Sequence, residues 1–255
     1  MSYKLVAQTR LSTLAAACVA FSSLAVGANS AQALTVRISP TFGSTENTGS
    51  TANLNFGFVQ QGADVLLNLG IQNTTNGTVG LGATQSTLVG VGFNLPHIVT
   101  SVIAYNPQSS NFTKTFGSLP GSSGDAYLPP LGKFDVGIRS ADPTKVPKVS
   151  STFVGGNPQQ GLTAGQSGLV SFLLGGNNLT AFGVEAAFQN LFATSAFPSP
   201  GAQIAGRFQQ VNAGGGSDKV AGQATTTAVP TPALLPGLIG LGLSALRKRK
   251  QVTAS

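Results

Sequence analysis

The stretch "ADVLLNLGIQNTTNG" at residues 63–77 decides the fold class. Its apolar residues stand at every second position, at Val65, Leu67, Leu69 and Ile71, and this period of two places them on one face of a β-strand. Residues 73–77 are Asn, Thr and Gly, which favour a turn. The stretch therefore predicts a half-buried strand that ends in a tight connection.

Other short apolar runs, separated by Gly, Pro and Asn, predict further strands. They lie at residues 86–96, 97–107, 133–140, 165–176 and 180–192. In three of these runs the following residues share a face: Phe134, Val136 and Ile138; Val170, Phe172 and Leu174; Phe182, Val184, Ala186 and Phe188. We expect an all-β fold, a β-sandwich of the jelly-roll or immunoglobulin-like kind with about 8–10 strands. Most of the 15 phenylalanines belong to its core, and residues 106–132 and 141–161 form surface loops.

The charge is concentrated at the two ends of the chain. The net charge is +7, but six of the 14 basic residues lie at Lys4, at Arg10 and in the run 247–250, so the body between carries +1. A nucleic-acid binder needs a basic face that neutralises phosphates. The sequence therefore predicts a nearly neutral body that does not bind nucleic acid.

The N-terminus has the pattern of a secretory signal peptide. A basic start is followed by the apolar run "LSTLAAACVAFSSLAVGA" at residues 11–28 and by "ANSAQA" at residues 28–33. Ala31 and Ala33 form an A-x-A site, which predicts cleavage before Leu34. The alternative is a buried N-terminal helix. Cleavage would also remove Cys18, the single cysteine of the chain.

The C-terminus ends in an apolar segment followed by basic residues, "VPTPALLPGLIGLGLSALRKRK" at residues 229–250. The uninterrupted apolar part is shorter than the roughly 20 residues that a membrane span needs. Arg247, Lys248, Arg249 and Lys250 follow it directly and would stay on the cytoplasmic side. From the residues alone, a stop-transfer anchor is the plain interpretation.

The same segment resembles the tripartite PEP-CTERM sorting signal, in the PTPA-CTERM variant of cyanobacterial proteins. The matching residues are Pro230, Thr231, Pro232 and Ala233, followed by the apolar segment and the basic cluster. The resemblance implies recognition and cleavage by an exosortase-like membrane protease after transient membrane insertion. Within the body, residues 66–77, 90–96 and 207–220 resemble segments of the PEP-CTERM proteins called cistern proteins.

These observations divide the chain into five parts. Residues 1–33 are the signal peptide, 34–220 the β-sandwich domain, 221–228 a Thr/Ala linker, 229–250 the sorting signal and 251–255 a short tail. We expect a helix in the signal peptide and another in the sorting segment, on either side of the sandwich. The product is expected in the cell envelope, at the cell surface or outside the cell.

Residues that carry enzyme chemistry are scarce. His97 is the one histidine, and the mature chain would have no cysteine, so a Cys nucleophile and a Cys/His zinc site are excluded. We therefore expect no enzyme, no metal and no cofactor, and a structural protein of the surface or extracellular matrix that is associated with exopolysaccharide. Two alternatives remain open. One is a carbohydrate-binding module that uses Tyr105 and Tyr127; the other is a secreted hydrolase that uses carboxylates from the set Asp125, Asp135, Asp142 and Glu185.

Overall fold

The computed structural model describes residues 32–108, 110–122, 124–141, 153 and 156–225. These residues form one α-helix, α1 (Ala181–Ala193), and two short 3-10 helices, η1 (Pro40–Phe42) and η2 (Pro158–Gln160). They also form thirteen strands: β1 (Gln32–Ile38), β2 (Ala52–Gln61), β3 (Asp64–Asn73), β4 (Thr87–Phe93), β5 (Ser101–Pro107), β6 (Lys114–Gly117), β7 (Ala126–Leu128), β8 (Gly132–Phe134), β9 (Val136–Arg139), β10 (Leu162–Thr163), β11 (Ser167–Gly175), β12 (Ile204–Gln209) and β13 (Ser217–Ala224).

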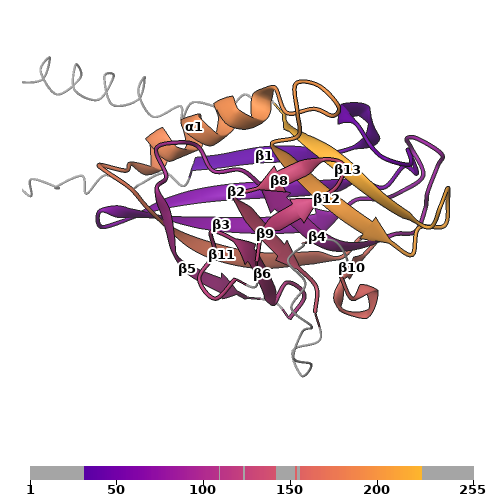
Figure 1. Ribbon diagram of the computed structural model, residues 1–255, viewed down its shortest axis with the longest axis horizontal. Coiled ribbons are helices and arrows are strands. Elements are labelled where there is room, and N and C mark those ends of the chain that lie inside the picture. The colour runs from indigo at the N-terminus through magenta and orange to yellow at the C-terminus, as the bar shows by residue number, and fades with distance from the viewer. Residues whose placement is uncertain (1–31, 109, 123, 142–152, 154–155, 226–255) are drawn as a thin grey trace, which may run out of the picture. The chain divides into compact units, whose positions relative to one another are not determined.

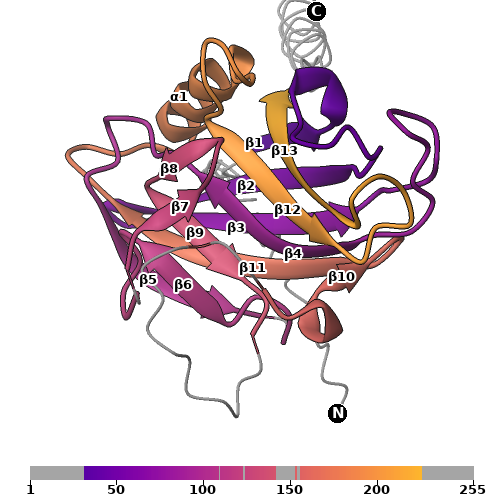
Figure 2. The same ribbon diagram turned by 45° about the vertical axis from the view of Figure 1, so that its right-hand side comes forward.

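Eleven of these strands form one antiparallel sheet. Its order is β5-β11-β3-β2-β1-β13-β12-β4-β9-β6, with β10 paired to β4, while β7 and β8 form a separate two-stranded sheet. Figure 1 shows β1, β2, β3 and β11 side by side, and in Figure 2 β12 and β4 cross in front of them. The predicted all-β class is confirmed. The strands expected to form a sandwich belong here to one continuous, curled sheet.

The main core fills the inside of the curl. Val65, Leu67, Leu69 and Ile71 of β3 are all buried, which confirms the predicted alternation. Phe93 of β4 lies with its ring centroid 5.7 Å from that of Phe56 on β2 and 5.6 Å from that of Phe172 on β11. Because strands from distant parts of the sheet meet in these ring contacts, the curl is held by apolar packing. Eleven of the phenylalanines are buried, as expected: Phe56, Phe58, Phe93, Phe112, Phe116, Phe134, Phe153, Phe172, Phe188, Phe192 and Phe208.

The segment expected as a strand at residues 180–192 is instead the helix α1, so that prediction was wrong. Val184, Phe188 and Phe192 are buried and follow one another at intervals of four residues, which is the helical period. The Thr180 side chain caps the helix by accepting the Gly183 N–H at 3.0 Å. Phe182, which an alternating strand would have buried, is 69% exposed. Burying three large side chains on one stripe outweighs the alternation.

A second, smaller core lies on the outer side of β4 and β9, beneath β7 and β8. Phe134 and Phe153 belong to this second core, and each lies over a glycine of β4. A Cβ added at Gly90 would lie 2.9 Å from the Phe153 ring, and one at Gly92 would lie 2.9 Å from the Phe134 ring. The two glycines therefore provide the space that the rings occupy.

Residues 133–140 were expected as one strand but are split into β8 and β9. Phe134 packs in the second core, whereas Val136 and Ile138 pack in the main core. The chain changes partners at Asp135, because β8 pairs with β7 while β9 pairs with β4 and β6. The shared face predicted for these three residues is therefore wrong.

Two boundaries also differ from the predictions. The segment 106–132, expected as a surface loop, contains β6, β7 and the buried Phe112 and Phe116. The linker expected at residues 221–228 begins later, because β13 continues through Ala224 and pairs there with Val36 of β1. Backbone hydrogen bonding to β1 holds residues whose Ala, Gly and Gln composition suggested a flexible connection.

Candidate functional site

The residues predicted to direct sorting lie at or beyond the ends of the described chain. Ala33 is exposed near the start of β1, and Leu34 is buried, with 3% of its surface exposed. Ala31 lies outside the described residues. So do the remaining sorting residues: Pro230, Thr231, Pro232, Ala233, Arg247, Lys248, Arg249 and Lys250.

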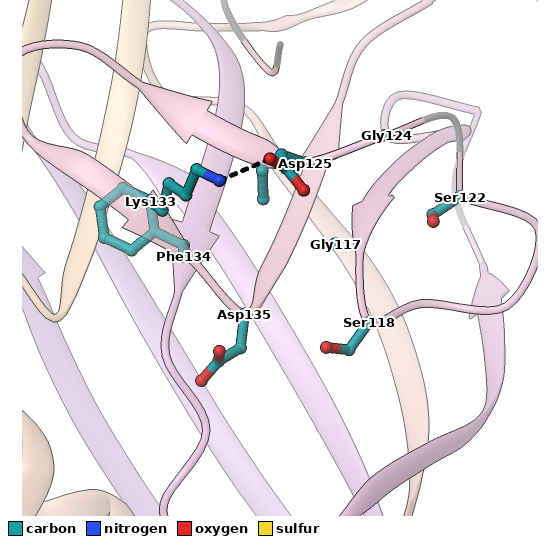
Figure 3. A pocket seen from close by; sticks show the side chains of 9 residues that line it. Gly117, Ser118, Ser122, Gly124, Asp125, Lys133, Phe134 and Asp135 are labelled. Atoms are coloured by element: carbon teal, nitrogen blue, oxygen red, sulfur yellow. Dashed lines mark hydrogen bonds and ion pairs between the residues drawn. The ribbon is translucent and has the colours of Figure 1, made fainter. Parts of the chain in front are cut away.

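Within the described body, a cavity of about 460 Å³ lies where β6 and β8 end and β7 begins (Figure 3). It gathers charged and hydroxyl side chains that the sequence analysis treated separately. Its lining residues are Gly117, Ser118, Ser122, Gly124, Asp125, Ala126, Lys133, Phe134 and Asp135.

The backbone around this cavity is fixed by a tight approach at Gly117. Gly117 has φ +74°, and a Cβ there would lie 2.2 Å from the Asp135 carbonyl oxygen, so a side chain is excluded. The Gly117 N–H donates to the Gly124 carbonyl at 2.7 Å, and the Ser118 N–H donates to the Asp135 carbonyl at 2.7 Å. These two bonds join the loop after β6 to the chain between β8 and β9.

Each charged side chain of the cavity has a partner in the protein: Lys133 and Asp125 form an ion pair, and Asp135 accepts a backbone hydrogen bond. Lys133 Nζ lies 2.6 Å from Asp125 Oδ2, and both side chains are about two-thirds exposed. The hydrogen bond to Asp125, together with its negative charge, raises the pKa of Lys133 above its usual range. Asp135 accepts the Leu95 N–H at 2.8 Å, and its own N–H donates to Asn94 Oδ1 at 3.0 Å. Asp135 therefore fastens the segment after β4 to β8.

This arrangement does not form the carboxylate pair that the hydrolase alternative requires. Asp125 and Asp135 line the same cavity, but in Figure 3 Asp125 is turned toward Lys133 and Asp135 points away from both. Glu185 lies on α1, where partial burial raises its pKa. Asp142 lies outside the described residues, and His97 is exposed in the turn before β5. The geometry offers a polar hollow with one ion pair.

The two tyrosines proposed for carbohydrate stacking have different surroundings. The Tyr105 hydroxyl donates to the Phe112 carbonyl, and its ring centroid lies 5.2 Å from that of Phe172. Burial raises the pKa of Tyr105 well above its usual range. Tyr105 is therefore part of the fold, and only Tyr127, at 36% exposed, offers a surface to a ligand.

A second cavity, of about 470 Å³, has an uncharged lining. It is formed by Gln85, Ser86, Thr87, Thr163, Ala164 and Gln210. Thr87 Oγ1 donates to Gln210 Oε1 at 3.2 Å, and Gln210 has the left-handed φ of +50°. Hydroxyl and carboxamide groups both donate and accept hydrogen bonds, so this lining suits a neutral polar ligand.

Sequence reasoning missed the buried carboxylate of Asp218. Asp218 lies in the segment "GGGSDKV" at residues 214–220, where Gly214 and Gly216 have φ of +60° and +78°, as in a glycine-rich turn. The Asp218 side chain, however, is only 1% exposed, and its carboxylate accepts hydrogen bonds from the segment 44–48. The only sequence signal is that residues 44–48 are rich in Ser and Thr, which supply the donors.

Across the described part of the chain, no cluster of three or more His, Cys, Asp or Glu has the closeness that metal binding needs. No helix among those residues has the length and hydrophobicity of a membrane crossing. Comparisons with protein-family models, with curated proteins and with solved structures yield no match to this chain.

Proposed function

We propose that this chain is an exported structural protein of the cell surface or extracellular matrix, whose C-terminal segment is processed by an exosortase-like membrane protease. The observation that carries the proposal is the position of the folded body between two sorting patterns. Among the described residues, the first strand, β1, starts at Gln32 beside the predicted cleavage site, and the last, β13, ends at Ala224, five residues before "VPTPALLPGLIGLGLSALRKRK". Export followed by C-terminal processing would therefore deliver an intact domain.

The strand order supports this proposal. β1 and β13 are neighbours and run antiparallel, with Val36 opposite Ala224, and the Thr225 N–H donates to the Thr35 carbonyl at 2.9 Å. The chain therefore enters β1 and leaves β13 at the same end of the sheet. The two segments that carry the sorting patterns are therefore attached to the same end of the sheet.

The burial pattern of β1 also supports cleavage before Leu34. The two residues of β1 that cleavage would remove, Gln32 and Ala33, pair with Phe58 and Gly57 at the end of the ladder. Leu34, Val36 and Ile38 of β1 are buried in the main core. The cleaved chain would therefore keep these three core residues. We also propose that the two halves of the curled sheet pack face to face, as the two sheets of a β-sandwich do. The ring contacts of Phe93 with Phe56 and Phe172 across the curl support this.

The second candidate function is a carbohydrate-binding module. The uncharged cavity beside Thr87 and Gln210 favours it, because sugar hydroxyls need groups that both donate and accept hydrogen bonds. Tyr105 no longer belongs to this hypothesis, since its ring and hydroxyl are used within the fold. The arrangement of Asp125 and Asp135 gives no support to the hydrolase alternative.

The test is cell fractionation in a host that contains an exosortase. We expect the unaltered chain in the surface and medium fractions. Replacing residues 230–233 by Gly-Ser-Gly-Ser should shift the protein to the membrane fraction, because the processing site is lost while the apolar segment and basic cluster remain. The matched control is Thr226→Ser, in the connection before the motif, which should leave the distribution unchanged. Recovery of the unaltered chain from the cytoplasm, or the same distribution for both motif forms, would contradict the proposal.

A further inference from the structure

The outward face of β1, β2, β3 and β11 carries three mostly polar and almost uncharged rows of residues, beside a fourth row of Val59, Leu66 and Leu173 that is apolar. On these strands the inward residues, such as Phe56 and Leu69, are buried, so the residues between them face outward. Cross-strand pairing sets the outward residues in rows. One row is Arg37, Asn53, Gln72 and Ser167; the next is Thr35, Asn55, Gly70 and Leu169; the third is Ala33, Gly57, Asn68 and Ser171. We call the surface formed by Thr35, Asn53, Asn55, Gly57, Asn68, Gly70 and Gln72 the carboxamide face.

Most hydrogen-bonding groups of the carboxamide face have no protein partner. Thr35 Oγ1 donates to Asn55 Oδ1 at 3.1 Å. Among the described residues, the side chains of Asn53, Asn68 and Gln72 make no hydrogen bond to other protein groups. A carboxamide presents two N–H donors and one carbonyl acceptor. The face therefore offers closely spaced donors and acceptors to an external partner.

The two glycines of the carboxamide face are not required by the fold. Glycine inside a strand weakens it, because it adds no packing and loses more conformational freedom on folding. A Cβ added at Gly57 would meet nothing closer than 3.7 Å, at the Asn68 carbonyl oxygen. One added at Gly70 would meet nothing closer than 3.7 Å, at Asn55 Cβ. Both positions have room for a side chain, and neither carries one.

Glycines elsewhere on the outer side of the same sheet show what such positions do. Gly90 and Gly92 of β4 lie beneath the rings of Phe153 and Phe134, and a Cβ at either would lie 2.9 Å from a ring atom. In that half of the sheet, glycines make room for flat groups that pack on the strands. The missing side chains of Gly57 and Gly70 leave a space above each glycine, in which a Cβ would meet no atom of the described chain closer than 3.7 Å.

Each of these spaces is edged by groups suited to a sugar ring. Gly70 lies directly between Asn55 of β2 and Leu169 of β11, and Leu169 is 40% exposed. Gly57 lies directly opposite Asn68. A sugar ring presents hydroxyls at its edge and C–H groups on its face, so carboxamides match the edge and a leucine matches the face. Arg37 is the single charged residue in the three rows and stands in an outer one.

We propose that the carboxamide face binds a neutral, unbranched polysaccharide, whose sugar rings lie over Gly57 and Gly70 and whose hydroxyls bond to the flanking carboxamides. An anionic polymer would find one cation there, and a protein partner would find none of the aromatic anchors that dominate such interfaces. The proposal deepens the proposed matrix role by naming the matrix component. It rests on that role only for the place where the protein meets the polysaccharide, because binding itself is measured on the purified chain.

The experiment is affinity electrophoresis of the purified full chain in gels that contain mixed-linkage β-glucan, dextran or alginate, together with sedimentation on microcrystalline cellulose. We expect retention by at least one neutral polysaccharide and none by alginate. In the double variant Gly57→Val and Gly70→Val, these spaces are filled by residues that favour strands. This variant should keep the circular dichroism spectrum and melting temperature while losing at least about tenfold in affinity. Asn55→Thr with Asn68→Thr should lose affinity in the same way.

Thr163→Val, which lines the uncharged cavity away from the carboxamide face, tests that cavity as the alternative binding site. The matched control is Asn190→Ala, an exposed carboxamide of α1 that belongs to neither site. It should bind as the unaltered chain does. The proposal is overturned if no neutral polysaccharide retains the chain, if alginate retains it equally, or if the double glycine variant binds normally. It is also overturned if binding is lost in Thr163→Val alone, or if sedimentation shows a dimer that the glycine substitutions dissociate. None of these outcomes depends on export, which the fractionation experiment tests separately.

Discussion

Thr48 donates two hydrogen bonds to Asp218, which lies 170 positions later in the chain. Asp218 Oδ2 accepts the Thr48 N–H at 2.9 Å and the Thr48 hydroxyl at 2.8 Å. The same carboxylate accepts the Ser44 hydroxyl at 2.7 Å and the Thr45 N–H at 3.2 Å, and Asp218 is 1% exposed. The buried charge thus joins the connection between β1 and β2 to the start of β13.

Replacing Asp218 by Asn should lower the free energy of unfolding by about 2–4 kcal/mol. The amide N–H₂ of the new residue would face N–H and O–H donors that now bond to a carboxylate oxygen, so buried donors would lose their acceptor. Urea unfolding measures the change. Asp125→Asn is the matched control, because its partner Lys133 is exposed and the pair is screened by water, so the urea midpoint should hardly change. Equal losses in the two variants would show that the buried network contributes little.

Tyr105→Phe should lower the free energy of unfolding by about 1 kcal/mol. The substitution removes the hydroxyl that bonds to the Phe112 carbonyl and keeps the ring that packs on Phe172. Polysaccharide retention should not change, since this side chain is used within the fold. Loss of retention without loss of stability would return Tyr105 to the role of a stacking platform.

The glycines of the two halves of the sheet should respond oppositely to alanine. Gly92→Ala should destabilise the protein by about 1–3 kcal/mol, because its Cβ would lie 2.9 Å from the Phe134 ring. Gly57→Ala should be neutral or stabilising by up to about 1 kcal/mol, since its Cβ meets ordinary contact distances and the unfolded chain loses freedom. Thermal and urea unfolding measure both. A comparable loss at Gly57 would mean that the fold itself requires this glycine.

Glu185→Gln should make stability less dependent on pH. Burial raises the pKa of Glu185 in the folded protein, so the folded state holds the proton more tightly than the unfolded state. The unaltered protein therefore loses stability as pH rises from about 4.3, the unfolded value, through the raised folded value. Relative to it, the variant should gain a few tenths of a kcal/mol between pH 3 and pH 7, a small effect because the side chain is partly exposed. Urea midpoints at the two pH values test this, and a difference that stays constant with pH would contradict it.

The sequence predicts an element correctly where its apolar residues fit only one hydrophobic period. β3 follows from its alternation, because no other period fits Val65 to Ile71. At α1 two periods coincide: Phe182, Val184, Ala186 and Phe188 alternate, while Val184, Phe188 and Phe192 repeat every four residues. The capping position of Thr180 is the local signal that favours the helix.

The remaining features depend on contacts between distant residues. β6 and β7 lie in a Gly- and Ser-rich segment whose few apolar residues, such as Phe112 and Phe116, show their burial only once the sheet has curled. Asp218 resembles any turn-flanking aspartate, because its partners at residues 44–48 are far away in the chain. The cavity near Asp125 and Asp135 likewise requires a glycine, Gly117, to meet the backbone of Asp135.

Export and processing are decided by the intact mass of the protein recovered from its native envelope or culture medium. We expect the mass of a chain that begins at Leu34 and ends near Pro232, which establishes both cleavage steps at once. A mass that retains residues 1–33 would contradict the signal peptide. A mass that retains Arg247 to Lys250 would contradict C-terminal processing and make the last apolar segment a lasting anchor.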